Sequence, residues 1–452
     1  MRQKLSTVSI QEKEDSPFFS GLIGEEARVR RWEIRGLRSK RVRVFDPAQV
    51  TAFGAPEVDP ESVGLGRDDV ESIWSAVVDF YKTGFHPALG LCIRRRGEVM
   101  LDRTIGHARG NSPDDPEGTP LIPATPDTLF NFFSGSKAVT AMLIHLLAQR
   151  EQLHVDEPVA TFIPEFARNR KHRITIRDLL THRAGIPDVP PEVVDVDLLQ
   201  EPQRILELIY EVEPTYRPGT VPAYHAVISG FIFAELIKRI SGLGIREFLH
   251  EEISEPLSMS HFNYGVPEAR LDEVAIDACT GPKLIWPMKD IFEKALGVSV
   301  EELIAISNDP RFRMGIVPSA NLIATSDDIC RFFELLVAGG VYDDNRIFTE
   351  STVRGATAPQ TPGRVDRTLL MPLSYSMGFM LGTEPVGLYG IRCGKAFGHV
   401  GLSNILAWAD PERDISVAFL NSGKPFVAVE TYHWLNIVRL ISARIPRDGH
   451  RF

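Results

Sequence analysis

A serine and a lysine stand three positions apart in the segment Phe133-Ser134-Gly135-Ser136-Lys137, at the start of a stretch with helical apolar spacing over residues 137–149. Residues three apart are neighbours on one face of a helix. A serine hydroxyl is a weak nucleophile until a base takes its proton, and a partly desolvated lysine can be neutral often enough to act as that base. The pair therefore predicts nucleophilic catalysis, whereas an N-cap serine beside a solvated lysine is the purely structural alternative.

Two later segments place a tyrosine and a histidine in predicted loops. Tyr224 lies in Val221-Pro222-Ala223-Tyr224-His225-Ala226, and His399 lies in Phe397-Gly398-His399-Val400-Gly401-Leu402, directly before a predicted strand. Either segment alone is typical of an ordinary packed loop or turn. The order Ser-x-x-Lys, then Tyr-x-x, then His-x-Gly is much less expected by chance, and it favours the catalytic interpretation.

Motifs of several other enzyme classes do not occur in the sequence. It contains no G-x-S-x-G, no G-x-x-x-x-G-K-[ST] and no H-E-x-x-H, and no G-x-G-x-x-G follows a predicted strand. The four cysteines are far apart and are predicted to be small buried side chains, not disulfide partners or zinc ligands; they are Cys92, Cys279, Cys330 and Cys393. We therefore expect neither a cofactor nor a metal ion.

The three motifs resemble those of the serine β-lactamase and penicillin-binding-protein-like superfamily. Within it they are most similar to class C-like β-lactamases and to the related esterases of the family VIII type. The resemblance covers residues 60–445 and includes three further stretches. Residues 179–185 resemble the family's L-L-T-H-x-S-G segment, residues 321–328 resemble its G-x-x-S-T-x-x-D helix start, and residues 375–379 resemble its Y-G-x-G-W strand.

The resemblance implies an α+β fold of the β-lactamase/DD-peptidase type, in which an antiparallel sheet is flanked by helices and interrupted by an all-helical domain. Periodicity points the same way, because strand patterns cluster near both ends of the chain and helix patterns fill the middle. We predict an N-terminal extension over 1–60 and a discontinuous sheet domain over 61–134 and 321–452. An inserted helical domain is predicted over 135–320, with a cleft-covering segment at 280–313.

The spacing of apolar residues also predicts individual elements. Alternating patterns predict strands at 41–45, 89–93, 98–101, 405–409 and 415–420. Helical spacing predicts helices at 68–81, 137–149, 176–180, 203–212, 226–241, 245–257 and 427–445. Ser299-Val300-Glu301-Glu302 is a capping box that predicts the start of another helix.

The resemblance implies catalytic roles for the matching positions. Ser134 would be the acylated nucleophile and Lys137 its deprotonating partner. Tyr224 would relay the proton, either as base for the serine or as acid for the leaving group. A lowered phenol pKa beside Lys137 is the physical requirement for such a relay.

The resemblance also implies how a substrate would be held. The backbone N–H groups of Ser134 and Leu402 would form the oxyanion hole. Gly401 would let the acyl group lie against the strand edge without a Cβ in the way. His399 stands where penicillin-binding relatives often have a lysine, and it would hydrogen-bond the tyrosine or the substrate.

Two departures from the family pattern concern the substrate. Ala226 replaces an asparagine whose amide usually holds a peptide or lactam side chain. His399-Val400-Gly401 replaces Lys-Thr-Gly, so the cation and the hydroxyl that would grip a substrate carboxylate are both missing. Both changes favour neutral esters over peptidoglycan or β-lactams. His225 is either a solvated loop residue or part of the substrate-binding cleft wall.

The composition is that of an acidic globular protein. Of the 452 residues, 43% are hydrophobic and 24% charged, and the formal net charge of −10 argues against nucleic acid as the main partner. We expect a cytoplasmic protein without membrane contact, because no apolar leader or bilayer-length apolar stretch is visible. The basic stretch 28–43 is either a patch for an anionic partner or a strand facing water or a neighbouring subunit, so a homo-oligomer through the N-terminal extension stays open.

Three functions are consistent with these observations. The leading hypothesis is a serine hydrolase that cleaves small or short-chain carboxylic esters through a Ser134 acyl-enzyme. The same site could instead serve an amide hydrolase of the β-lactamase or D-aminopeptidase type, or an acyltransferase. A catalytically silent scaffold is the alternative from another class, and the intact Ser134, Lys137 and Tyr224 argue against it.

Overall fold

The computed structural model describes residues 39–284, 286, 289–290, 292–293, 297–426 and 431–449. Most of the predicted N-terminal extension and of the basic stretch 28–43 therefore lies outside the described residues, as does the start of the predicted helix 427–445. Within these ranges, no helix has both the length and the apolar character needed to cross a bilayer.

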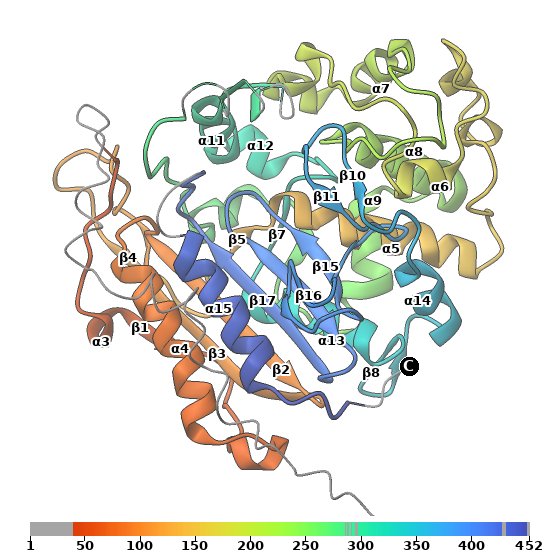
Figure 1. The fold of residues 1–452 in the computed structure, drawn as a ribbon. Coiled ribbons are helices and arrows are strands. Elements are labelled where there is room, and N and C mark those ends of the chain that lie inside the picture. Colours follow the sequence, from red (N-terminus) through yellow and green to blue (C-terminus); the bar gives the residue numbers. More distant parts are fainter. Residues whose placement is uncertain are drawn as a thin grey trace, which may run out of the picture. The chain divides into compact units, whose positions relative to one another are not determined.

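An eight-stranded antiparallel sheet brings together the two ends of the chain (Figure 1). Its strand order is β1-β3-β2-β17-β16-β15-β12, with β4 paired to β3. The central pair joins β2 to β17, from Leu89 opposite Asn421 to Arg95 opposite Ile415. The strands are β1 (Thr51–Phe53), β2 (Ala88–Arg95), β3 (Glu98–Arg109), β4 (Ile122–Pro123), β12 (Met380–Leu381), β15 (Phe397–Val400), β16 (Leu406–Asp410) and β17 (Ile415–Asn421). The predicted α+β class and the strands predicted at 89–93, 98–101, 405–409 and 415–420 are confirmed.

Helices cover both faces of this sheet, because successive residues of a strand point to opposite sides. Val417 of β17 packs in one apolar cluster with α4 (Arg67–Lys82) and α15 (Thr431–Arg444). Its neighbour Ala418 packs in a second cluster that includes α13 (Ser326–Val337). Figure 1 shows α4 and α15 side by side across the near face of the sheet, where the two helices contact each other.

The second cluster continues into the helical part of the chain, which carries most of the predicted helices. These are α5 (Ser136–Gln149), α6 (Ile176–Leu180), α7 (Pro202–Glu211), α8 (Ile228–Ser241), α9 (Ile245–Leu249), α11 (Val300–Asn308) and α12 (Pro310–Met314). The predicted capping box is confirmed, since the Ser299 and Glu302 side chains each bond the other's backbone N–H. A small sheet also lies here and consists of β5 (Phe130–Asn131), β7 (Leu322–Ala324) and β6 (Phe262–Tyr264). The segment 135–320 therefore contains a short strand as well as helices.

Shorter elements complete the fold. They are α3 (Pro47–Val50), α14 (Glu350–Thr357) and the strand pairs β8 (Val341–Tyr342) with β9 (Asn345–Arg346), β10 (Arg364–Val365) with β11 (Pro372–Leu373), and β13 (Val386–Gly387) with β14 (Gly390–Ile391). The four cysteines are free, with three buried and Cys279 half-buried.

Four predicted elements are wrong in type or extent. Residues 41–45 form no strand; the Val42 N–H instead donates to the Gly84 carbonyl, and the chain enters the sheet only at β1. The helix predicted from 226 begins at Ile228, which leaves Tyr224 and Ala226 in a loop. The helix predicted to 257 ends at Leu249 and continues as a π-helical turn. Residues 375–379 form a turn before β12, not a strand.

Candidate active site

Ser134 lies in a sharp 3-10 turn, Phe133–Gly135, that runs directly into α5. Phe133 has φ 47°, a left-handed conformation that a bulky residue adopts only when its surroundings hold it there. The Phe133 N–H donates to Asn131 Oδ1 at 3.2 Å, and the Ser136 hydroxyl donates to the Phe133 carbonyl at 2.5 Å. A Cβ on Gly135 would lie 2.3 Å from the Phe132 ring, so this position requires glycine. The turn thereby fixes Ser134 at the start of α5.

Lys137 lies one helical turn after Ser134, as the spacing predicts. Its Nζ is 3.1 Å from Ser134 Oγ and donates to the Ser319 carbonyl at 3.0 Å. The side chain is buried, and burial lowers the pKa of Lys137 well below its usual value. A lysine whose pKa is lowered in this way can be neutral and accept a proton from the serine.

Sequence reasoning missed the Ser319 carbonyl that orients Lys137. Thr140 of α5 donates to the neighbouring Pro318 carbonyl at 2.7 Å, and the Ser319 hydroxyl donates to the Val227 carbonyl at 3.2 Å. These bonds hold the 318–319 backbone against α5. Any residue type supplies a backbone carbonyl, so no side-chain pattern could have signalled this contact.

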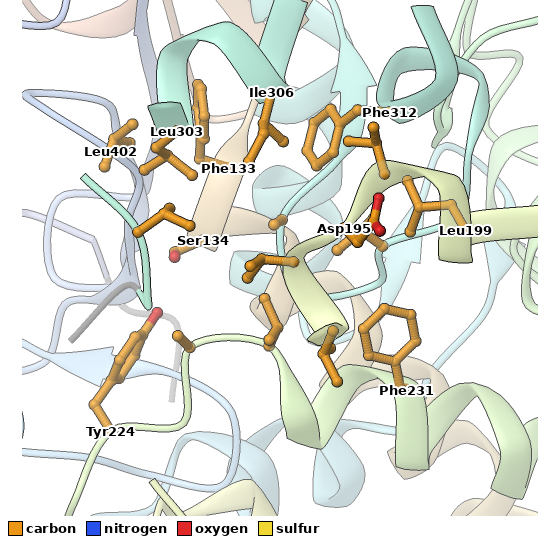
Figure 2. Close-up of a pocket in the computed structure, with 18 residues that line it drawn as sticks. Phe133, Ser134, Asp195, Leu199, Tyr224, Phe231, Leu303, Ile306, Phe312 and Leu402 are labelled. Carbon is orange, nitrogen blue, oxygen red and sulfur yellow. The ribbon is translucent and has the colours of Figure 1, made fainter. Parts of the chain in front are cut away.

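Tyr224 completes a cluster with the serine and the lysine. Its hydroxyl faces the Ser134 hydroxyl (Figure 2), and Lys137 Nζ lies 4.8 Å from the centre of its ring. Burial raises the pKa of Tyr224 above its usual value, although the nearby Ser134 side chain opposes this. The predicted lowering of the phenol pKa is therefore wrong. A phenol with a raised pKa is protonated near neutral pH, so Tyr224 can donate a proton.

A buried carboxylate that the sequence analysis did not identify holds the Tyr224 loop in place. Asp366 Oδ1 accepts from the backbone N–H groups of Tyr224, Thr368 and Leu369 at 3.2, 2.8 and 2.9 Å. Its Oδ2 accepts from the Tyr375 hydroxyl at 3.0 Å. Asp366 lies far from Tyr224 in the sequence, so only the folded chain brings these groups together.

Replacing Asp366 with alanine should leave these four donors without an acceptor. Each unsatisfied buried donor costs ~1–3 kcal/mol, so we expect a loss of about 3 kcal/mol or more in the free energy of unfolding, together with slower acylation. Urea unfolding and the rate of the first turnover check this prediction. Asp366→Asn should recover most of the stability, because its amide oxygen can still accept from the three N–H groups. Equal losses in both variants would contradict this explanation.

Two histidines pack around Tyr224 in a neutral, buried cluster. The His182 ring centre is 4.6 Å from that of Tyr224, and His182 Nδ1 accepts from the His225 N–H at 3.1 Å. The His225 side chain is fully buried, and burial lowers its pKa to about 3. Its ring centre is 5.3 Å from that of His182. His225 does not line the cavity beside Ser134. His225 thus packs behind the Tyr224 loop and is not part of the cleft wall.

The β15 segment supplies the last predicted site residues. His399 Nδ1–H donates to the Val400 carbonyl at 2.8 Å, so its Nε2 is an acceptor, and burial lowers its pKa to about 3. Its ring centre is 6.3 Å from that of Tyr224. A Cβ on Gly401 would lie 2.6 Å from the Ile405 side chain and 2.8 Å from the Phe132 carbonyl. Close packing alone therefore requires glycine at 401, independently of any acyl group.

A cavity opens beside Ser134 and is almost entirely apolar. Its volume is about 100 Å³, or about 820 Å³ when all the space between its lining atoms and its open mouth is included. Ser134, Tyr224 and Asp195 are the polar residues in its wall, and Leu402 and Ala226 lie in that wall as predicted. Figure 2 shows the Ser134 and Tyr224 hydroxyl groups facing each other at one end, with Leu199 and Phe231 at the other.

Two segments outside the motifs build much of the cavity wall. One is residues 193–199, and the other comprises Val298, α11 and α12. They contribute Val193, Val194, Asp195, Val196, Leu199, Val298, Leu303, Ile306 and Phe312. The second segment falls within the predicted cleft-covering region 280–313. The first was missed, and its only signal is the run of apolar residues Val193, Val194, Val196, Leu198 and Leu199 between acidic ones.

Several known proteins are similar to this chain in sequence and fold. Residues 75–440 match the model of the Beta-lactamase family. Esterase/beta-lactamase LipL of Mycobacterium tuberculosis is 27% identical over 352 residues, which cover 73% of this chain and 79% of that protein. A penicillin-binding protein homolog from Caulobacter crescentus is 27% identical with a TM-score of 0.69, covering 84% of this chain and 99% of that one. A family VIII carboxylesterase has the same fold at 24% identity and a TM-score of 0.69, covering 83% of this chain and 98% of that one.

The family match spans the sheet from β2 to β17, the Ser134–Lys137 pair and the Tyr224 and His399 segments. A hydroxyl beside a buried lysine at the end of an apolar cavity is the arrangement that serine acyl chemistry needs. The chain belongs to the Beta-lactamase family and is an enzyme of the serine hydrolase type.

Proposed function

We propose that this enzyme hydrolyses carboxylic esters with small apolar acyl groups through an acyl-enzyme on Ser134. The observation that carries the proposal is the 3.1 Å approach of Ser134 Oγ to the buried Lys137 amine at the end of an apolar cavity. The name of LipL, an esterase/beta-lactamase, supports ester cleavage and leaves β-lactam cleavage as a second candidate.

The first half of the reaction forms the acyl-enzyme. Neutral Lys137 takes the Ser134 hydroxyl proton as Oγ bonds to the ester carbonyl carbon. The backbone N–H groups of Ser134 and Leu402 stabilise the resulting oxyanion. The bond from carbon to the leaving oxygen then breaks while Tyr224 donates its proton to the departing alcohol, and the Lys137 ammonium restores the proton to Tyr224.

The second half releases the acid. A water molecule takes the place of the alcohol and loses a proton to the neutral Lys137 amine as its oxygen bonds to the acyl carbon. The bond to Ser134 Oγ breaks while the Lys137 ammonium returns the proton to the serine oxygen, which restores the site to its starting state.

The cavity wall favours an apolar acyl group over a charged or amide-bearing one. Ala226 offers no amide to an acylamino side chain, and buried neutral His399 offers no cation to a substrate carboxylate. Each missing charged or bidentate contact is worth ~1.5–3 kcal/mol. Two such losses weaken binding by roughly two to four decades at ~1.4 kcal/mol per decade.

We therefore expect ready hydrolysis of p-nitrophenyl acetate and butyrate, and slow or no hydrolysis of nitrocefin. Ala226→Asn combined with His399→Lys should raise the nitrocefin rate relative to the ester rate. Steady-state kinetics with the three substrates checks this. Efficient nitrocefin turnover by the unmodified chain would overturn the esterase proposal and favour the β-lactamase candidate.

The α11 side of the cavity should set the acyl length. Ile306 lines the cavity, so Ile306→Trp would fill space that a longer acyl chain needs. We expect kcat/KM for butyrate to fall about tenfold or more relative to acetate, because one or two buried methylenes are worth ~1–3 kcal/mol. Ala305→Trp on the exposed side of the same helix is the matched control. An unchanged acyl preference in Ile306→Trp would show that α11 does not define the acyl pocket.

A further inference from the structure

The hairpin of β10 and β11 presents a group of apolar side chains to solvent. Val365, Leu370 and Met371 are 53%, 58% and 45% exposed, and we call these three residues the apolar tip. Single exposed apolar residues are ordinary on protein surfaces, whereas a cluster of them marks an interaction site. Other large exposed apolar side chains of the described residues lie on other elements, such as Phe53 on β1 and Val386 on β13.

Hydrogen bonds hold the apolar tip in this exposed position. The Asp366 N–H donates to the Met371 carbonyl at 3.0 Å, and the Leu370 N–H donates to the Asp366 carbonyl at 2.9 Å. Leu370 has φ 56°, a left-handed conformation that is unfavourable for a leucine and persists only under such constraint. The exposure of the tip is therefore built into the loop and is not the fraying of a loose segment.

The exposed charged residues of the hairpin itself are both basic. Arg364 and Arg367 are exposed, and Arg364 is anchored by donating to the Thr220 carbonyl at 2.7 Å. Asp366 is the one acidic residue of 363–373, and it is fully buried with its carboxylate turned towards the Tyr224 loop. The outward surface of this hairpin thus combines apolar side chains with two guanidinium groups.

The hairpin is also joined directly to the active-site loop. The Arg367 N–H donates to the Pro222 carbonyl at 2.9 Å, two residues before Tyr224, and Leu369 packs against the cluster that contains Tyr224. In Figure 1 the hairpin lies beyond the end of β15, the strand that carries His399. Whatever the tip contacts is consequently brought next to the segment that carries the predicted proton donor.

We propose that the apolar tip docks on the surface of an anionic lipid bilayer. Val365, Leu370 and Met371 enter the headgroup region, and Arg364 and Arg367 contact lipid phosphates. Apolar side chains gain free energy by leaving water, and guanidinium groups pair with phosphate through charge-assisted hydrogen bonds. The local positive charge decides this contact, because charges of the acidic chain further than about 8 Å away are screened at physiological salt. Docking goes beyond ester hydrolysis, does not depend on it, and departs from the expectation of no membrane contact.

Co-sedimentation of the full chain with lipid vesicles tests the proposal. We expect binding to phosphatidylcholine vesicles that contain phosphatidylglycerol, and weak or no binding to pure phosphatidylcholine. The double variant Leu370→Ser/Met371→Ser should bind anionic vesicles at least about tenfold more weakly, since each substitution removes apolar surface that docking would bury. Arg364→Gln/Arg367→Gln should lose the preference for the anionic vesicles.

A matched double variant controls for the loss of exposed apolar surface in general. Leu121→Ser/Ile122→Ser removes two exposed apolar side chains at β4 and should bind vesicles as the unmodified chain does. The p-nitrophenyl acetate rate should be unchanged in the Leu370→Ser/Met371→Ser and Leu121→Ser/Ile122→Ser variants, so failure of docking is distinguishable from failure of the proposed chemistry. Absence of binding to anionic vesicles, or equal binding by the tip variant, would overturn the proposal. A dimer that dissociates only in the tip variant would assign the tip to a second copy of the chain instead.

Discussion

Replacing Ser134 with alanine should reduce turnover of p-nitrophenyl esters by about 10⁴-fold or more, because loss of the nucleophile removes the covalent pathway altogether. The fold should survive, since a serine-to-alanine change at a helix start costs only ~1 kcal/mol and Lys137 keeps its bond to the Ser319 carbonyl. Steady-state kinetics, labelling with a fluorophosphonate and thermal unfolding check the three parts of this prediction.

Ser136 is the matched control because it belongs to the same short motif. Its hydroxyl donates to the Phe133 carbonyl and accepts from the Leu322 N–H at 3.0 Å, so it has a structural role. Ser136→Ala should lower the unfolding temperature while Ser134 still takes up the label. A label that remained on the Ser134→Ala variant, or a rate close to that of the unmodified enzyme, would refute the assigned nucleophile.

Replacing Lys137 with arginine should be nearly as severe as replacing Ser134, although the formal charge is conserved. Arginine stays protonated at every accessible pH and cannot take the serine proton. General bases contribute ~10²–10⁴-fold, and nucleophile and base act as a unit, so we expect a loss near the upper end of that range. Burst kinetics for acylation measures it, with Lys395→Arg, an exposed lysine, as the control. Substantial activity in Lys137→Arg would show that another group is the base.

The pH dependence gives a second test of the same residue. Burial lowers the pKa of Lys137, so its neutral, active form persists to a lower pH than an exposed lysine allows. Activity should be present above this folded-state pKa and be lost as the pH falls through it. Between this pKa and the usual value for the unfolded chain, unfolding takes up a proton, so the free energy of unfolding rises with pH. Lys137→Met should lose that rise, which chemical denaturation at several pH values would detect.

The sequence determines the parts of the site that depend on short spacing. Three residues separate Ser134 from Lys137, and any helix there brings them to one face, so their 3.1 Å approach follows from local geometry. The capping box at Ser299 and the hairpins of the large sheet are predictable for the same reason, since their signals lie within a few residues. The α+β class follows from the distribution of these local patterns along the chain.

Contacts between segments distant in the sequence determine the other features of the active site. The Ser319 carbonyl orients Lys137 and the Asp366 carboxylate holds the Tyr224 loop, yet neither position carries a recognisable motif. Burial raises the pKa of Tyr224 and lowers that of His225, and both shifts depend on what packs around the side chain. Hydrogen-bonding groups of the backbone and the exclusion of water have no signature in residue spacing, because both arise only when remote segments pack together.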